Sequence, residues 1–214
     1  MTTSTRSDEI ETIEERSMAQ VAEPDTLGLW GFATGTWITG TVIAGVFPTA
    51  ALPAAAPVLI VFAGMAQFIA GLYAFRRANA LAGTAFTSFG AFNVAAGFVF
   101  LLQALRLLST TGPALNLVGF LLLSFGFIAI GLTLAALNTN AGLVATLASL
   151  AIGYVMTGIA AASGYFGLPG ALGEVGHVGG YALIFSAGMA YYTGLALILN
   201  SSWRRVVLPI WGRA

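Results

Sequence analysis

Between Leu27 and Leu199 the chain carries only four formally charged residues. They separate apolar stretches of roughly 20 residues, the length of helix that crosses a hydrocarbon core ~30 Å thick. The charged residues are Arg76, Arg77, Arg106 and Glu174, and the six stretches cover residues 27–46, 57–75, 84–104, 115–137, 142–162 and 176–199. This pattern predicts a polytopic membrane protein with six transmembrane spans.

The composition agrees with a chain that lies mostly in lipid, because 58% of its residues are hydrophobic and 7% are charged. Within a bilayer every backbone polar group is hydrogen-bonded inside the protein, so only helices and closed barrels span it. The apolar stretches are continuous and lack the two-residue alternation of barrel strands. We therefore predict an all-α fold in which six helices form a bundle over residues 27–199.

The two ends of the chain differ from this domain. Residues 1–26 hold seven of the eight acidic residues, a composition typical of a solvated, disordered tail. A short amphipathic helix over residues 10–18 is the alternative. Neither a basic start nor a short apolar segment precedes residue 27, so the first span is expected to act as its own insertion signal. Residues 200–214 are expected to form a second tail.

The arginines predict the orientation of the chain in the membrane. Seven of the eight lie on the side shared by both termini and the loop between the second and third spans, and the other side carries only Arg106. Short loops rich in Lys and Arg stay in the cytoplasm. Both tails are thus expected in the cytoplasm, with the protein in the plasma membrane, or the inner membrane of a bacterium. No basic stripe indicates a nucleic-acid partner.

Small and polar residues inside the spans indicate how the helices meet. Gly31 and Gly35 lie four apart on one helix face, a spacing that favours close helix packing within a chain or between subunits. Gln67 and Asn93 fall near the middle of the second and third spans, where an amide needs a partner or lines a pathway. A hydrogen bond between helices and a contact with substrate both fit this placement.

The single histidine, His177, follows Glu174 at the outer end of the sixth span. Such a pair can respond to pH and couple protons to transport, or the histidine can be a plain membrane-interface residue. The sequence shows no nucleophile-base-acid set, metal-ligand cluster or phosphate-binding loop. We therefore expect no enzymatic activity, no catalytic residues, no metal site and no cofactor. The candidate functions that remain are transport, channel conduction, and sensing or assembly.

Residues 67–93 read QFIAGLYAFRRANALAGTAFTSFGAFN and resemble the acetate uptake transporter family, also described as succinate-acetate permeases. The similar features are the Gln-x-x-x-Gly of Gln67 and Gly71, then Asn79, the run at 84–88 and Gly90. Residues 27–29 with Phe32 resemble the end of the family's amino-terminal signature, and residues 207–210 resemble its carboxy-terminal tail. The resemblance covers about residues 23–212, and its ordered motifs are specific.

This resemblance implies a six-helix bundle that assembles as a homohexamer. It implies that each protomer has its own anion pathway for acetate, and in some members succinate, often coupled to protons. It also implies a hydrophobic constriction at Phe32, Phe89 and Leu150. These positions lie six, six and nine residues into spans that run in the same direction, or roughly 9 to 13 Å from the inner edge. One ring at one depth is therefore expected.

A pathway for a small carboxylate needs apolar walls and a few hydrogen-bond donors. The candidate substrate-binding residues are Pro24, Leu27, Gly28, Gln67 and Asn93. The chain departs from the family where Glu23 and Asp25 replace an asparagine and an alanine of the signature, because these acids would repel an anion unless neutralised. In the constriction, Phe89 replaces a tyrosine.

We predict a membrane transporter or channel for acetate and similar small monocarboxylates, linked to protons and gated by the apolar constriction. Two alternatives stay open. One is a non-transporting membrane sensor or assembly protein with the same fold. The other is a transporter of another small solute, such as a neutral or cationic species that suits an acidic mouth.

Overall fold

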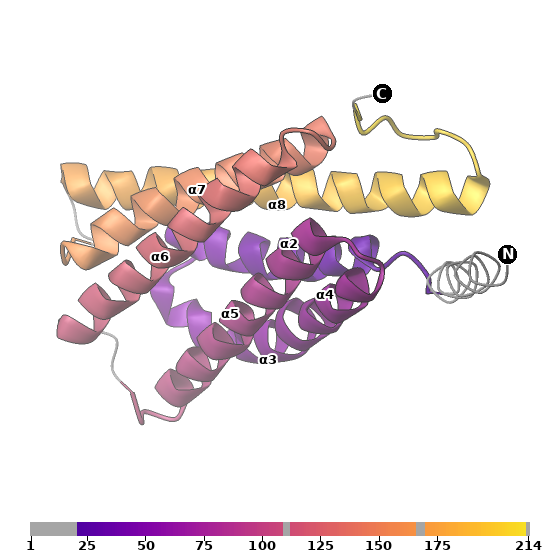
Figure 1. Ribbon diagram of the computed structural model, residues 1–214. Helices are drawn as coiled ribbons and strands as arrows, with labels where there is room; N and C mark the ends of the chain where they lie inside the picture. Colours follow the sequence, from indigo (N-terminus) through magenta and orange to yellow (C-terminus); the bar gives the residue numbers. More distant parts are fainter. Residues whose placement is uncertain (1–20, 109–111, 166–169, 213–214) are drawn as a thin grey trace, which may run out of the picture.

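The computed structural model describes residues 21–108, 112–165 and 170–212 (Figure 1). In these residues the regular structure is helical, apart from one isolated bridge between Asn140 and Gly212. The α-helices are α2 (Asp25–Ile43), α3 (Ala56–Ile60), α4 (Gln67–Arg76), α5 (Ala80–Ala104), α6 (Pro113–Ala136), α7 (Ala141–Ala162) and α8 (Ala171–Trp203). The all-α prediction is confirmed for the described part of the chain. The predicted tail at 1–26 falls mostly outside it.

Among the described residues, five helical segments are long and apolar enough to cross a membrane, and they match the second to sixth predicted spans. The first predicted span corresponds to α2, which is not among the five. Its 19 residues include five threonines and four glycines, which lower its hydropathy. α2 packs between α8 and the α4–α5 pair (Figure 1). The first predicted span, at residues 27–46, therefore stays a prediction.

The segment from Thr49 to Arg76 is a continuous helical rod whose pitch changes along its length. It begins as the 3₁₀-helix η1 (Thr49–Ala55), continues through α3 and the π-helix η2 (Val61–Ala66), and ends as α4. The predicted start at residue 57 was too late. Pro53 lies inside η1 and Pro57 is the second residue of α3, so neither proline marks the beginning of this helical segment.

The carboxy-terminal helix is also longer than predicted. α8 has 33 residues, which corresponds to about 50 Å at 1.5 Å per residue, so it exceeds a ~30 Å hydrocarbon core. It ends at Trp203, inside the segment predicted as a tail from residue 200. The following residues fold back along it, because Asn200 Nδ2 donates to Leu208 O at 2.8 Å and Tyr192 stacks on Trp211.

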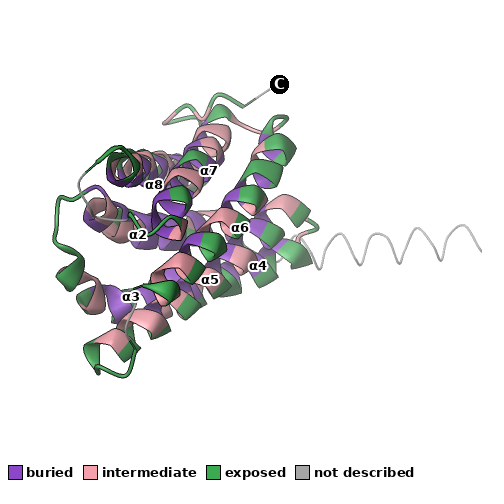
Figure 2. Ribbon diagram, turned by 90° about the vertical axis from the view of Figure 1, so that its left-hand side faces the viewer, coloured by how far each residue is buried: buried purple, intermediate pink, exposed green. Residues whose placement is uncertain are grey.

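Buried residues face the interior of the bundle and exposed residues face outward (Figure 2). Many of the exposed residues have large apolar side chains. On α6, for example, Leu117 is 71% exposed and Phe127 is 77% exposed. An apolar exterior of this extent suits lipid and neighbouring subunits better than water. The interior is closely packed by small residues. A methyl group at Gly35 would lie 2.7 Å from Ala63 Cβ, which confirms intramolecular packing at this glycine.

Candidate functional site

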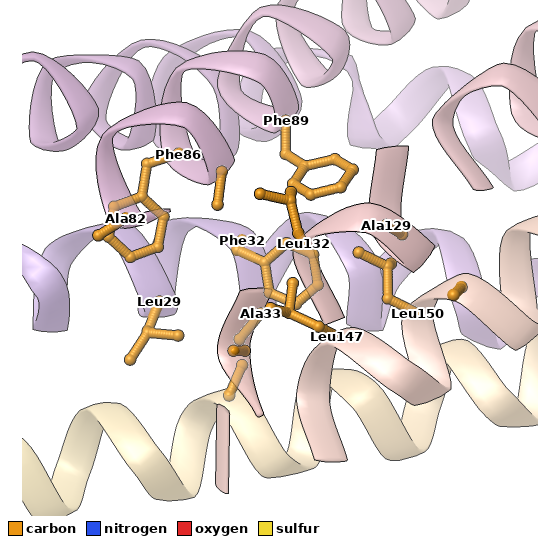
Figure 3. Close-up of a cluster of buried hydrophobic side chains, with 14 of the residues drawn as sticks. Leu29, Phe32, Ala33, Ala82, Phe86, Phe89, Ala129, Leu132, Leu147 and Leu150 are labelled. Carbon is orange, nitrogen blue, oxygen red and sulfur yellow. The ribbon is translucent and has the colours of Figure 1, made fainter. Parts of the chain in front are cut away.

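Three helices bring the three predicted constriction residues into one buried cluster. The ring centroids of Phe32 on α2 and Phe89 on α5 lie 6.0 Å apart. Phe32 is 4% exposed, Phe89 is 2% exposed and Leu150 on α7 is fully buried. Figure 3 shows these side chains extending into the same apolar cluster. The structure therefore places together residues that are up to 118 positions apart in the sequence.

Aromatic side chains extend this cluster across the space between α5 and α6, which are consecutive in the chain but hardly contact each other. Phe125 on α6 lies with its ring centroid 5.9 Å from that of Phe89 and 4.5 Å from that of Phe92. Tyr154 on α7 lies 6.1 Å and 5.6 Å from the same two rings. We call the set of Phe32, Phe89, Phe92, Phe125, Leu150 and Tyr154 the apolar plug.

Phe92, Phe125 and Tyr154 were not among the residues predicted from sequence. Tyr154 lies four residues after Leu150, so helical spacing places both on one face of α7 and would have found it. Phe92 lies three residues after Phe89 on α5 and carries the same signal. Phe125 has no such signal, because its position depends on how α6 packs. Tyr154 also gives the plug a phenol hydroxyl, which Phe89 does not provide.

The two predicted amides meet one helical turn from the plug. Asn93 Nδ2 donates to Gln67 Oε1 at 3.2 Å and to Ala63 O, in the π-helix η2, at 3.1 Å. Gln67 is fully buried and Asn93 is 6% exposed. Within the described parts of the chain, Gln67 Nε2 is buried without a hydrogen-bond partner. A buried donor without an acceptor is costly, so this N–H is a candidate donor to a carboxylate oxygen.

The other three predicted binding residues lie at the N-terminal end of α2, away from this amide pair. They are Pro24, Leu27 and Gly28. Pro24 O accepts a hydrogen bond from Gly28 N at 3.1 Å in the first turn. Both residues are buried, and a methyl group at Gly28 would lie 2.5 Å from the ring of Phe86. Leu27 is 41% exposed and faces outward. The structure does not bring these three residues together with Gln67 and Asn93.

The two acids that replace signature residues lie in different environments. Glu23 Oε2 forms an ion pair with Arg77 Nη2 at 2.8 Å, and Arg77 Nη1 donates to Val21 O. Asp25 Oδ2 accepts from Asn79 Nδ2 at 3.5 Å. Burial, and secondarily the negative charge of Glu23, raise the pKa of Asp25 from 3.8 to about 6, although Arg77 acts in the opposite direction. Glu23 is therefore not a free negative charge, and Asp25 ionises at a higher pH than an ordinary aspartate.

His177 and Glu174 lie near each other at the far end of the bundle. His177 Nδ1 is 3.8 Å from Glu174 Oε2, and the two side chains are 36% and 69% exposed. Ion pairs this exposed contribute little to stability. His177 also borders a cavity of about 260 Å³. The cavity is lined by Val42, Ile43, Gly45, Phe47, Pro48, Thr49, Gly176 and His177.

Comparison with known proteins identifies the family. A profile of the GPR1/FUN34/yaaH family matches residues 8–211. The chain belongs to this family. It is 26% identical over 191 residues to the succinate-acetate/proton symporter SatP of Escherichia coli K12, an alignment that covers 89% of this chain and 96% of SatP. It is 27% identical over 190 residues to ammonia transport outward protein 2 of Saccharomyces cerevisiae, covering 84% of this chain and 64% of that protein.

The solved structure of the bacterial acetate channel SatP has the same fold as this GPR1/FUN34/yaaH member. The TM-score is 0.79 at 26% sequence identity, with 89% of this chain and 99% of the SatP chain covered. The resemblance predicted from residues 67–93 is thus confirmed. The chain is a multi-pass membrane protein of a transporter and channel family, which supports the expectation that it is not an enzyme.

Proposed function

We propose that this protein moves acetate and similar small monocarboxylates across the plasma membrane, along a pathway that the apolar plug closes. Succinate is the larger acid to test. The observation that carries the proposal is the convergence of Phe32, Phe89 and Leu150 in one buried cluster. The similarity to SatP, which is described as a succinate-acetate/proton symporter and as an acetate channel, supports the substrate class.

The plug suits a solute that combines an apolar and a polar part. A ring of apolar side chains resists wetting and so disfavours hydrated ions. Acetate presents a methyl group to such a ring, and protonation removes the charge of its carboxylate. The tightly packed rings of Phe32, Phe89 and Tyr154 correspond to a closed pathway, so passage requires their side chains to rotate. Gln67 Nε2 offers a donor one turn away.

The proposal includes the assembly and the orientation in the membrane. From residue 27 onward α2 acts as the remaining span, and it tolerates its threonines because Thr34, Thr39 and Thr41 donate to backbone carbonyls of the preceding turn. Six protomers form a homohexamer through their apolar outer faces. Both termini lie in the cytoplasm, where Arg76, Arg77, Arg204 and Arg205 anchor the inner side. Transport is linked to protons.

Uptake of radiolabelled acetate into proteoliposomes tests the proposed function. Empty liposomes measure the passive leak of acetic acid, which is subtracted. We expect saturable uptake that unlabelled acetate abolishes and succinate reduces more weakly. Uptake equal to that of empty liposomes would overturn the proposal, and it would favour the non-transporting sensor or assembly protein if no other solute was taken up either.

A second candidate function is transport of ammonia or ammonium. It is favoured by the yeast relative named ammonia transport outward protein 2 and by the acidic Asp25, whose Oδ1 is buried without a partner in the described chain. A stopped-flow assay with a pH-sensitive dye inside the vesicles separates the two. Ammonia influx makes the lumen alkaline, whereas acetic acid influx makes it acidic. A response to ammonium salts alone would favour this second function.

A further inference from the structure

One seam between α2 and α5 connects the plug to the acidic end of the chain. Asp25 begins α2 seven residues before Phe32, so both lie on the same helix face about 10 Å apart. Asn79 caps α5 ten residues before Phe89. The contact between Asp25 and Asn79 and the contact between Phe32 and Phe89 therefore join the same two helices, at the end and in the middle of one seam.

Phe86 on α5 and Leu29 on α2 belong to the same buried apolar cluster as Phe32 and Phe89 (Figure 3). Phe86 is 6% exposed and Leu29 is 4% exposed. The small residue Gly28 lets α2 approach Phe86 closely. A solute that passes the plug along this seam therefore meets apolar side chains first and then the Asp25 carboxyl group.

The hydrogen bonds around Asp25 leave one of its oxygens unused. Asn79 Oδ1 accepts from Ala82 N at 3.1 Å, which fixes the amide so that its Nδ2 points to Asp25 Oδ2. Asp25 Oδ1 is buried and has no hydrogen-bond partner among the described residues. An ionised carboxylate oxygen in that position is costly, whereas a protonated carboxyl group is neutral.

The neighbouring charged groups do not compensate the negative charge of an ionised Asp25. Arg77 is engaged by Glu23 at 2.8 Å and by Val21 O, and Glu23 itself repels a second negative charge. On the side of α8, the neighbouring Thr26 donates to a backbone carbonyl, Gly194 O, at 3.3 Å. Glu23 and Arg77 are the described charged groups that act on Asp25, and their effects oppose each other.

We infer that Asp25 is a proton-binding residue at the inner mouth that determines whether a carboxylate can pass along the α2–α5 seam. The inference rests on the proposed function. When Asp25 is ionised it repels a carboxylate, and when it takes a proton from water it becomes neutral and can donate a hydrogen bond to one. The proton returns to water when Asp25 ionises again, so the O–H bond is the only bond that forms or breaks.

The pH range of this switch follows from burial. Because the pKa of Asp25 is raised to about 6, the residue is mostly protonated at pH 5 and mostly ionised at pH 7. If only the protonated form conducts, permanent removal of the charge increases uptake by about tenfold at pH 7 and by less than about twofold at pH 5. These ratios compare variant with wild type at the same pH. The fraction of the substrate present as acetic acid is then the same for both proteins and does not affect the ratio.

Two measurements test the inference. The first is infrared difference spectroscopy of the full-length protein between pH 4 and pH 8, which detects the carbonyl stretch of a protonated carboxyl group. We expect a band that titrates near pH 6 in wild type and in the control variant Glu174→Gln, and that is missing in Asp25→Asn and Asp25→Ser. A band that persists in both Asp25 variants would overturn proton binding at Asp25.

The second measurement is acetate uptake at pH 5 and pH 7, with equal pH on both sides of the vesicle. Asp25→Asn and Asp25→Ser should exceed wild type by about tenfold at pH 7 and match it at pH 5, whereas Glu174→Gln should follow wild type. Asp25 variants with the pH dependence of wild type would overturn the control of passage. No uptake by any variant or wild type would overturn the proposed function, and the infrared band would still decide whether Asp25 binds the proton.

Discussion

The phenyl ring of Phe89 on α5 packs against the phenol ring of Tyr154 on α7, with ring centroids 6.1 Å apart. Phe89 also contacts the rings of Phe32 on α2 and Phe125 on α6. The Phe89 side chain thus links α5 to three other helices. One of them is α6, which otherwise makes few contacts with α5. A change at Phe89 is therefore expected to affect the whole plug.

Phe89→Ala should open the plug. The substitution removes a ring that is 2% exposed, and truncation of a buried Phe typically costs about 3–5 kcal/mol of stability. We expect faster acetate uptake, or a smaller preference for acetate over succinate, in the protein that folds. The matched control is Phe127→Ala on α6, because Phe127 is 77% exposed. Unchanged kinetics for both acids in Phe89→Ala would contradict a constriction at this position.

Tyr154→Phe should slow acetate uptake without a loss of stability. The substitution keeps the ring in the plug and removes only the hydroxyl, the one polar group that the plug side chains carry. One hydrogen bond to a passing carboxylate contributes about 1 kcal/mol, so we expect a decrease of roughly fivefold. Tyr181→Phe is the control, since Tyr181 is 58% exposed on α8. An equal effect of both substitutions would rule out a specific role for the Tyr154 hydroxyl.

Gly119→Ala should destabilise the bundle, whereas Gly131→Ala on the same helix should not. A methyl group at Gly119 would lie 2.1 Å from Ala162 N, a backbone atom that cannot rotate away, and one at Gly131 would meet nothing within 4 Å. Overpacking of this kind costs about 1–3 kcal/mol. Thermal unfolding in detergent should show a lower Tm for Gly119→Ala alone. Equal Tm values would contradict the close contact of α6 with α7.

The stability of the protein should decrease as the pH rises from about 4 to above 6. Because the pKa of Asp25 is raised from 3.8 to about 6, the folded state binds this proton more tightly than the unfolded state. The contribution is present at low pH and is lost as Asp25 ionises. We expect about 1–2 kcal/mol after allowance for its partial exposure. Asp25→Asn should remove this part of the pH dependence of Tm, and an unchanged profile would show that Asp25 does not cause it.

Much of the fold could be predicted from the distribution of charge alone. Apolar stretches longer than 18 residues have few alternatives in a helical chain, so five of the spans were located correctly. The limits of the helices were less predictable. Pro53 lies within the 3₁₀-helix η1 and Pro57 in the first turn of α3, rather than before the helical segment. α8 continues past residue 199 because the thickness of the lipid does not restrict its polar end.

The site was only partly predictable. Phe32, Phe89 and Leu150 could be named because they match a family pattern, and helical spacing would have added Tyr154. The ion pair of Glu23 with Arg77 and the partner of Asp25 could not be predicted, since they depend on where α2 begins relative to the loop between α4 and α5. The acids therefore looked like free charges in the sequence, although the structure neutralises one of them with an arginine.

Acetate uptake by Phe32→Trp is the measurement that tests the central claim most directly. The larger ring would overfill a plug in which Phe32 is 4% exposed and lies 6.0 Å from Phe89. Phe127→Trp is the matched control on the outer face of α6. Loss of saturable uptake in Phe32→Trp, with uptake retained in Phe127→Trp and both proteins folded, is the predicted result. Wild-type uptake by Phe32→Trp would contradict a pathway through the plug.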